Sequence, residues 1–207
     1  MFARSTTVRG DPAAIDAAVS YVRDEVLPAV EPMAGCVGLS LLTNHRNGRC
    51  VLTSAWADEE ALQASAEGTR GFRARFGELL DAVPMVATWE IAVMHRLRPA
   101  GDGACCRVVR GALHEPAAMD DVLGTVRTSL LPRLEELPGF CSVSFLVDRI
   151  SGRTTTTVTY SDRAAMARAV DPGGALREEF SRASRTTVQE VSEYALSVAH
   201  LRVPETV

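Results

Sequence analysis

The side chains that most often carry out chemistry are sparse in this sequence of 207 residues. All 22 basic residues are arginines, so the absence of lysine excludes Schiff-base catalysis and a P-loop lysine. The four histidines stand far apart, at His45, His95, His114 and His200, and no CxxC or HxxxH spacing occurs. His45 and Cys50, facing each other across one hairpin, would supply only two ligands. The sequence therefore predicts no metal site.

Arginines form the clearest charged groups, and they have two interpretations. They lie in the segment that follows each hairpin, at Arg70, Arg73 and Arg75 in the first half and at Arg177, Arg182 and Arg185 in the second. Such residues either line the mouth of a site for an anionic ligand or form the solvated side of an amphipathic helix. The net charge of −4 gives no reason to expect binding to a phosphate backbone, so we expect no nucleic-acid partner.

The composition indicates a cytoplasmic protein. Five cysteines, an odd number, fit reduced thiols better than a disulfide framework. The amino terminus lacks the apolar core of a signal peptide. No apolar stretch approaches the roughly 20 residues that a membrane span requires, so no membrane partner is expected.

An internal repeat organises the chain. The segment Asp11–Asp16 reappears as Glu115–Asp120, a shift of 104 positions, and the same shift aligns Gly35 with Gly139. It predicts two homologous repeats, residues 1–98 and 105–207, joined by a polar, Gly-rich linker at residues 99–104.

Each repeat shows the same predicted order of elements, βαββαβ. A first strand leads to a helix that starts at Pro12 or Pro116 and is stopped or bent by Pro28 or Pro132. Two strands joined by a tight turn follow, then a second helical region and a fourth strand. The expected turn centres are Asn47-Gly48 and Ser151-Gly152, which would pair Leu39 with Trp56 and Val143 with Tyr160.

A four-stranded antiparallel sheet with helices on one face leaves its other face uncovered. Neither face of the fourth strand is strongly polar, with Trp89, Ile91 and Val93 on one side and Thr88, Ala92 and Met94 on the other. The open face needs a partner, and a second repeat in the same chain supplies one. We therefore expect an α+β protein in which two sheets pack as a pseudo-dimer, present as a monomer or as a homodimer.

Both halves resemble the dimeric α/β-barrel superfamily, and within it the antibiotic biosynthesis monooxygenase-like (ABM) group. The motifs are the strand entry Leu137-Pro138-Gly139-Phe140, the run from Ser54 to Leu62 around Trp56, and the strand from Trp89 to Val93. The resemblance implies two ferredoxin-like βαββαβ repeats packed as an intramolecular dimeric α/β barrel.

The resemblance also implies a function, a cofactor-independent monooxygenase acting on a small apolar or aromatic molecule. Such a pocket removes a proton, orients the substrate and stabilises developing charge. The candidate catalytic residues are Asn44, Trp56, Trp89 and His95, with His45, Tyr160 and Tyr194 as further candidates. The alternative is a non-catalytic protein that binds a small ligand or joins other subunits, and the sequence leaves it open whether the chain is an enzyme.

A comparison with haem-degrading relatives and a comparison of the two repeats refine these expectations. Haem-degrading relatives carry a tryptophan and an iron-binding histidine in the second helical region, and residues 64–75 contain neither, so haem degradation is disfavoured and no cofactor is expected. The repeats differ at Trp56 against Tyr160 and at Trp89 against Glu193, which predicts one functional pocket at most, in the first half. The polar run Thr154–Thr157 marks a place where the second repeat faces water or a wetter cavity.

Overall fold

The computed structural model describes residues 1–201 and 204–206. Arg202, Val203 and Val207, which the sequence assigns to the second repeat, lie outside the described residues. The chain divides into two compact units. Unit 1 holds residues 1–89 and the described residues 195–201, and unit 2 holds residues 90–194 and 204–206.

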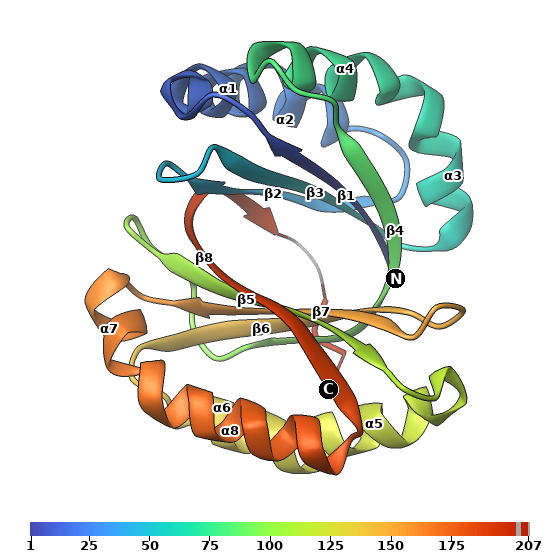
Figure 1. Ribbon diagram of the computed structural model, residues 1–207. Coiled ribbons are helices and arrows are strands. Elements are labelled where there is room, and N and C mark those ends of the chain that lie inside the picture. Colours follow the sequence, from blue (N-terminus) through green and yellow to red (C-terminus); the bar gives the residue numbers. More distant parts are fainter. Residues whose placement is uncertain (202–203, 207) are drawn as a thin grey trace. The chain divides into compact units, whose positions relative to one another are not determined.

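The first half of the chain forms the strands and helices of one repeat. They are β1 (Phe2–Arg9), η1 (Pro12–Ala14), α1 (Ile15–Tyr21), η2 (Val22–Val26), α2 (Leu27–Val30), β2 (Cys36–Asn44), β3 (Arg49–Trp56), α3 (Glu59–Gly68), α4 (Arg70–Leu79) and β4 (Met85–Arg96). The helices lie on one face of the β1–β3–β2 sheet (Figure 1). Asp58 caps α3 by accepting a hydrogen bond from the backbone N–H of Ala61.

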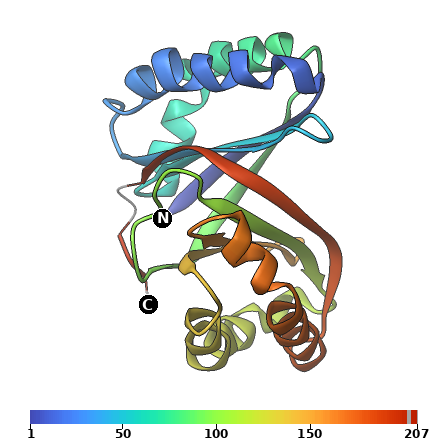
Figure 2. The same cartoon turned by 90° about the vertical axis from the view of Figure 1, so that its left-hand side faces the viewer.

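The second half repeats this order. Its elements are β5 (Cys105–Leu113), η3 (Pro116–Ala118), α5 (Met119–Thr125), η4 (Val126–Leu130), α6 (Leu131–Glu135), β6 (Phe140–Asp148), β7 (Arg153–Tyr160), α7 (Arg163–Arg168), α8 (Val170–Ala183) and β8 (Thr186–Leu201). Helices α5, α6 and α8 lie on one face of the β5–β7–β6 sheet, as the turned view also shows (Figure 2). The predicted α+β fold of two βαββαβ repeats is confirmed.

The last strand of each repeat crosses from one unit to the other. Strand β4 enters unit 2 after Trp89 and pairs there with β6, whereas β8 enters unit 1 after Tyr194 and pairs with β2. Backbone hydrogen bonds join the strands in the closed order β1-β3-β2-β8-β5-β7-β6-β4, the topology of an eight-stranded barrel. Sequence repeats and compact units therefore divide the chain at different residues.

Both crossing strands carry a bulge at the same place. In β4 the bulge lies between Ile91 and Val93. In β8 it lies between Leu196 and Val198, which pair with the adjacent residues Leu42 and Leu41 of β2. The pairing makes Val198 the counterpart of Val93, a shift of 105 rather than 104. Trp89 therefore corresponds to Tyr194, and the pairing of Trp89 with Glu193 expected from the gapless repeat is wrong.

The prolines in the first helix of each repeat do not end it. Pro28 and Pro132 lie in α2 and α6, directly after the π-helical turns η2 and η4. Proline has no N–H and its ring clashes with a carbonyl one turn earlier, and a wider π turn accommodates both effects. The helix therefore continues past each proline, to Val30 and to Glu135.

The hairpin register also differs from the expected one. Asn44 pairs with Arg49, so four residues form the turn, and Leu39 lies opposite Ser54 rather than Trp56. In the second repeat Val143 likewise lies opposite Val158 rather than Tyr160. The turn is longer than the two-residue type because only its last residue, Gly48, has a positive φ.

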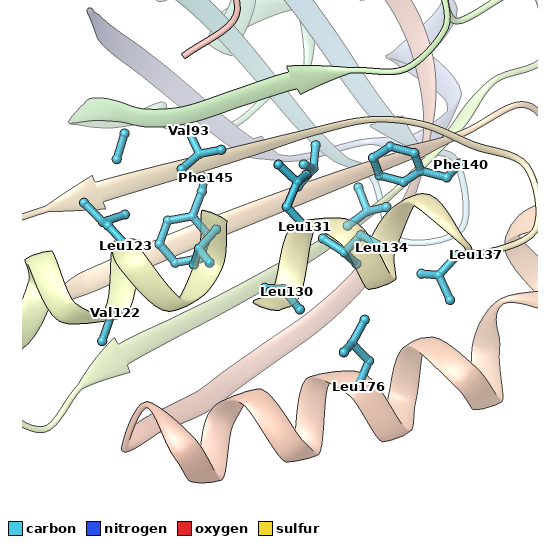
Figure 3. Packing of buried hydrophobic residues seen from close by; sticks show 14 of the residues in the cluster. Val93, Val122, Leu123, Leu130, Leu131, Leu134, Leu137, Phe140, Phe145 and Leu176 are labelled. Carbon is cyan, nitrogen blue, oxygen red and sulfur yellow. The ribbon is translucent and has the colours of Figure 1, made fainter. Parts of the chain in front are cut away.

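Each unit has its own core, and the crossing strands contribute to it. In unit 2 the buried cluster combines Val93 of β4 with Phe145 of β6, Leu134 of α6 and Leu176 of α8 (Figure 3). In unit 1 Val198 of β8 joins the cluster around Trp56. Among the described residues, no helix is both long enough and apolar enough to span a membrane.

A glycine fixes the entry to the second strand of each repeat. Gly35 and Gly139 have φ values of +75° and +69°, and a Cβ on them would lie 2.4 and 2.3 Å from the Cβ atoms of Ala61 and Ala165. Both backbone conformation and space therefore require glycine.

We expect Gly139→Ala to lower the free energy of unfolding by roughly 2 to 4 kcal/mol, because it adds left-handed strain to overpacking. Chemical denaturation would measure the change. The control is Gly71→Ala on α4, where a Cβ meets nothing within 4 Å and the helix should gain up to about 1 kcal/mol. Equal stability of the Gly139 variant and the wild type would contradict this account.

Candidate functional site

A cavity of about 70 Å³ lies in unit 2, between the β5–β7–β6 sheet and helices α6 and α8. Most of its wall is apolar and comes from Leu130, Leu134, Leu137, Phe145, Val158, Leu176 and Phe180. Thr154 and Thr156 of β7, which belong to the polar threonine run, also line it. The cavity can therefore take an apolar group while offering a few polar partners.

Arg107 is the buried charge of this cavity. It projects from β5, is only 6% exposed, and donates hydrogen bonds to the carbonyl oxygens of Met166 and Ala169 at the end of α7. Its guanidinium also forms an ion pair with Glu193 of β8, at 2.8 Å. Burial of a guanidinium requires such partners, because an unpaired charge is costly to remove from water.

Tyr160 lies beside Arg107 at the end of β7. The carbon atom at the centre of the Arg107 guanidinium is 5.8 Å from the centre of the tyrosine ring. Burial raises the pKa of the Tyr160 hydroxyl, and the nearby Arg107 offsets part of this rise. The hydroxyl is therefore protonated at neutral pH and can donate a hydrogen bond to a ligand oxygen.

Two residues of α8 complete this end of the cavity. A Cβ placed on Gly173 would lie 3.8 Å from a terminal nitrogen of Arg107 and 3.9 Å from the Tyr160 hydroxyl oxygen. The glycine thus leaves space next to the two polar groups. Arg177 is half-buried and lines the same cavity, and no carboxylate of residues 1–201 or 204–206 forms an ion pair with it. The arrangement favours a ligand with a negatively charged or electron-rich oxygen.

The corresponding space in unit 1 is much smaller, about 20 Å³. Leu52 stands where the second repeat has Thr156, and Trp56 stands where it has Tyr160. The larger residues fill the space, so the larger of these two cavities lies in the second repeat. Cavity volume favours the second repeat, whereas the location of a functional pocket in the first half stays an untested prediction.

Trp56, Trp89 and Asn44 do not line either of these cavities. Trp56 is fully buried in the unit 1 core and donates a hydrogen bond to Ser54. Trp89 is 9% exposed and donates to Ser5 on β1, at 2.8 Å. Asn44 accepts a hydrogen bond from the Arg46 backbone N–H in the hairpin turn. These positions point to roles in packing and in turn geometry.

His95 lies away from the unit 2 cavity as well. Its Nε2 atom is 2.8 Å from Glu135 of α6, its Nδ1 atom is 3.5 Å from Glu205, and its ring stacks on Phe140. His200 is its counterpart in unit 1 and forms an ion pair with Glu31 at 3.1 Å. Because Glu31 and Glu135 also correspond, the two histidines tie the crossing strands to equivalent helix ends.

The other candidates are dispersed. His45 forms an exposed pair with Asp16, and the buried Tyr194 hydroxyl has no hydrogen-bond partner within the described parts of the chain. Arg70 and Arg75 pair with Glu67 and Glu78 on the helix surface. Arg185 lies 4.0 Å from Glu115, and the exposed Arg182 lines none of the cavities described above.

The thiols and metal-binding residue types offer no second centre in the region that the structure describes. No group of three or more His, Cys, Asp or Glu side chains there could hold a metal ion. Burial raises the pKa of the Cys106 thiol to about 12 and that of Cys50 to about 11. Both thiols stay protonated at neutral pH and are poor nucleophiles.

Arg107 and its counterpart Arg4 were missed from the sequence. Strand pairing relates them by a shift of 103, since Phe2 pairs with Trp56 and Cys105 pairs with Tyr160. One extra residue precedes Pro116, so the gapless shift of 104 hides the match. The sequence did contain a signal for these residues. Each repeat has an arginine inside its apolar first strand, and a one-residue gap in the alignment matches the two.

Comparisons with known proteins agree with the fold. The family model described as antibiotic biosynthesis monooxygenase matches residues 1–75. The uncharacterized protein Rv2557 of Mycobacterium tuberculosis is 41% identical over 208 aligned positions, covering 100% of this chain and 92% of that protein.

Two solved structures share the fold at low sequence identity. A candidate monooxygenase from Fusobacterium nucleatum has a TM-score of 0.70 and 10% identity, covering 97% of this chain and 94% of that one. An anthrone oxidase-like protein has a TM-score of 0.65 and 12% identity, covering 99% and 94%. At these identities the likeness concerns the fold alone.

The glycine at the polar end of the cavity provides a test of the site. We expect Gly173→Ala to weaken binding of 1-naphthol severalfold, because the new methyl group occupies space beside Arg107 and Tyr160. The same change should stabilise helix α8 by about 0.5 to 1 kcal/mol. Naphthol fluorescence titration and thermal unfolding measure the two effects.

The matched control is Gly124→Ala on α5, whose Cβ would meet nothing within 4 Å. It should gain comparable stability and bind 1-naphthol as the wild type does. Unchanged binding by both Gly173→Ala and the bulkier Gly173→Leu would show that the ligand does not use this cavity.

Proposed function

Because this chain belongs to the family of antibiotic biosynthesis monooxygenase-like proteins, in a tandem-repeat form, we propose that it oxidises a small aromatic metabolite in the unit 2 cavity with molecular oxygen. The observation that carries the proposal is the combination of Arg107, Tyr160 and Arg177 at one end of an otherwise apolar cavity. A planar phenol or anthrone matches both parts of this lining.

The volume of the cavity limits what is buried. At about 70 Å³ it is smaller than the roughly 150 Å³ cavity that binds benzene in an engineered protein. A ligand therefore inserts one ring edge with its oxygen toward Arg107, Tyr160 and Arg177, while the remainder lies toward the apolar wall at Phe180. This pose places the electron-rich oxygen at the positive end of the site.

The proposed reaction converts an anthrone and O₂ into a quinone and water. Positive charge on Arg177 and the hydrogen bond from Tyr160 stabilise the enolate formed when the methylene carbon loses a proton to solvent, while Glu193 already pairs with Arg107. The carbanion bonds to oxygen through electron transfer, giving a peroxide anion that is then protonated. Loss of the remaining C–H proton and cleavage of the O–O bond release water and leave the new carbonyl. The residues orient the substrate and stabilise charge, and O₂ is the oxidant.

The second candidate is a protein that binds such a ligand without transforming it. The residues that line the unit 2 cavity include no histidine and no carboxylate, so no side chain there is an evident general base. This observation favours simple binding, and the two functions differ in whether oxygen is consumed.

Oxygen uptake distinguishes the candidates. We expect the protein to accelerate oxygen consumption by a dihydroxyanthracenone above the rate without protein. Tyr160→Phe should lower kcat at least about tenfold, because one hydrogen-bond donor to the developing oxyanion is lost. An oxygen electrode and the quinone absorbance measure both.

The control is Tyr21→Phe in unit 1, whose hydroxyl makes only a long hydrogen bond, 3.5 Å, to the Phe72 carbonyl. It should keep wild-type activity. Binding of the substrate without uptake above the protein-free rate would contradict the oxygenase and support the binding protein.

A further inference from the structure

Unit 1 contains a buried arginine, Arg4, and a half-buried one, Arg73, that both lack a carboxylate partner within the described residues. Arg4 on β1 is 7% exposed and donates hydrogen bonds to the Ser65 hydroxyl, at 2.7 Å, and to the Leu62 carbonyl oxygen. Arg73 on α4 donates to the Thr69 hydroxyl and to the Ala66 carbonyl oxygen, the latter at 3.1 Å. All four acceptors are neutral, so neither positive charge is neutralised by them.

The two guanidinium groups act on each other. Burial lowers the pKa of Arg4, and the charge of Arg73 lowers it further. Burial and the nearby Arg70 lower the pKa of Arg73, against a smaller opposite effect of Glu67. Glu67 itself pairs with Arg70 on the surface, at 2.6 Å. Within residues 1–201 and 204–206, no Asp or Glu oxygen lies within 4.0 Å of either Arg4 or Arg73.

The second repeat shows how this buried charge is otherwise neutralised. Arg107 corresponds to Arg4. The two arginines donate to corresponding carbonyl oxygens, that of Met166 in α7 and that of Leu62 in α3. There Glu193 supplies the negative charge at 2.8 Å. The strand pairing relates β4 and β8 by a shift of 105 positions, so Thr88, which carries no charge, is the first-repeat counterpart of Glu193. Unit 1 thus has the cation of the pair and lacks its anion.

A small cavity of about 20 Å³ adjoins both arginines. Thr6, Ser54 and Thr69 supply polar atoms to its wall, and Val26, Val30, Leu39, Leu52 and Phe72 supply the apolar part. The space exceeds the roughly 10 to 15 Å³ that one water molecule needs. It therefore has room for one or two water-sized atoms, such as the oxygens of a carboxylate, next to an apolar surface.

We propose that unit 1 binds an organic carboxylate, with its oxygens between Arg4 and Arg73 and its apolar part against Phe72. The planar fork of a guanidinium matches a carboxylate through paired hydrogen bonds. A mostly apolar wall favours a carboxylate attached to an apolar body over the strongly hydrated inorganic phosphate ion. This site is separate from the unit 2 cavity and does not depend on the proposed oxidation.

Calorimetric titration tests the proposal with benzoate as the probe and inorganic phosphate as the comparison, at neutral pH and low ionic strength. We expect benzoate to bind, phosphate to bind much more weakly, and Arg73→Gln to weaken benzoate binding at least about tenfold. Arg4→Met should have the same effect. Because Arg4→Met removes a buried group that holds α3 at Leu62 and Ser65, Arg73→Gln carries the test if that variant does not fold.

Thermal unfolding separates a ligand site from a structural role. Without benzoate, Arg73→Gln should unfold at the same temperature as the wild type or a higher one, because it relieves repulsion with Arg4. A purely structural Arg73 would instead give a lower temperature, and that result would overturn the proposal.

Two matched variants locate the bound carboxylate. Arg70→Gln, an exposed neighbour on α4, should bind benzoate as the wild type does, and Arg177→Gln, at the corresponding position of unit 2, should keep the binding step that Arg73→Gln removes. Loss of binding in Arg177→Gln but not in Arg73→Gln would place the ligand in unit 2 and refute this inference, while leaving the proposed function intact. Preference for phosphate, or no binding of benzoate, would also refute it.

Discussion

Completion of each sheet by the last strand of the other repeat is the constraint on which this structure depends. Without the end of β8, strand β2 would be an exposed edge with unpaired backbone groups, and the same holds for β6 without β4. The crossing segments also deliver core residues, Val93 to unit 2 and Val198 to unit 1. A single repeat would therefore lack both hydrogen bonds and apolar cover, which the other repeat supplies.

A buried arginine on the first strand links this architecture to the sites. Arg4 and Arg107 donate hydrogen bonds to corresponding carbonyl oxygens of α3 and α7, those of Leu62 and Met166, so the same contact is part of the fold in both repeats. The repeats then diverge around it. Glu193 neutralises Arg107, whereas Arg4 has Arg73 as its charged neighbour. One inherited contact has thereby produced two different electrostatic environments.

Divergence of the strand after the hairpin decides where space remains. In the first repeat Leu52 and Trp56 fill the region between sheet and helices, and in the second Thr156 and Tyr160 leave a larger cavity. The tryptophan that stands out in the sequence therefore marks the better-packed unit. A large aromatic side chain removes cavity volume, so its presence argues for packing rather than for a pocket.

The sequence by itself determined the duplication, the βαββαβ order and the ABM-like fold, because periodicity, caps and turn residues are local features repeated at a fixed spacing. Only the tertiary structure determined which side chains lie together in the candidate sites. The bulges in β4 and β8, the π turns at Pro28 and Pro132, and the extra residue before Pro116 each shift a register by one position. Which side chains meet depends on such shifts between distant strands. The pairing of Arg107 with Glu193, and the lack of a carboxylate beside Arg4 in the described chain, therefore emerge only from the folded structure.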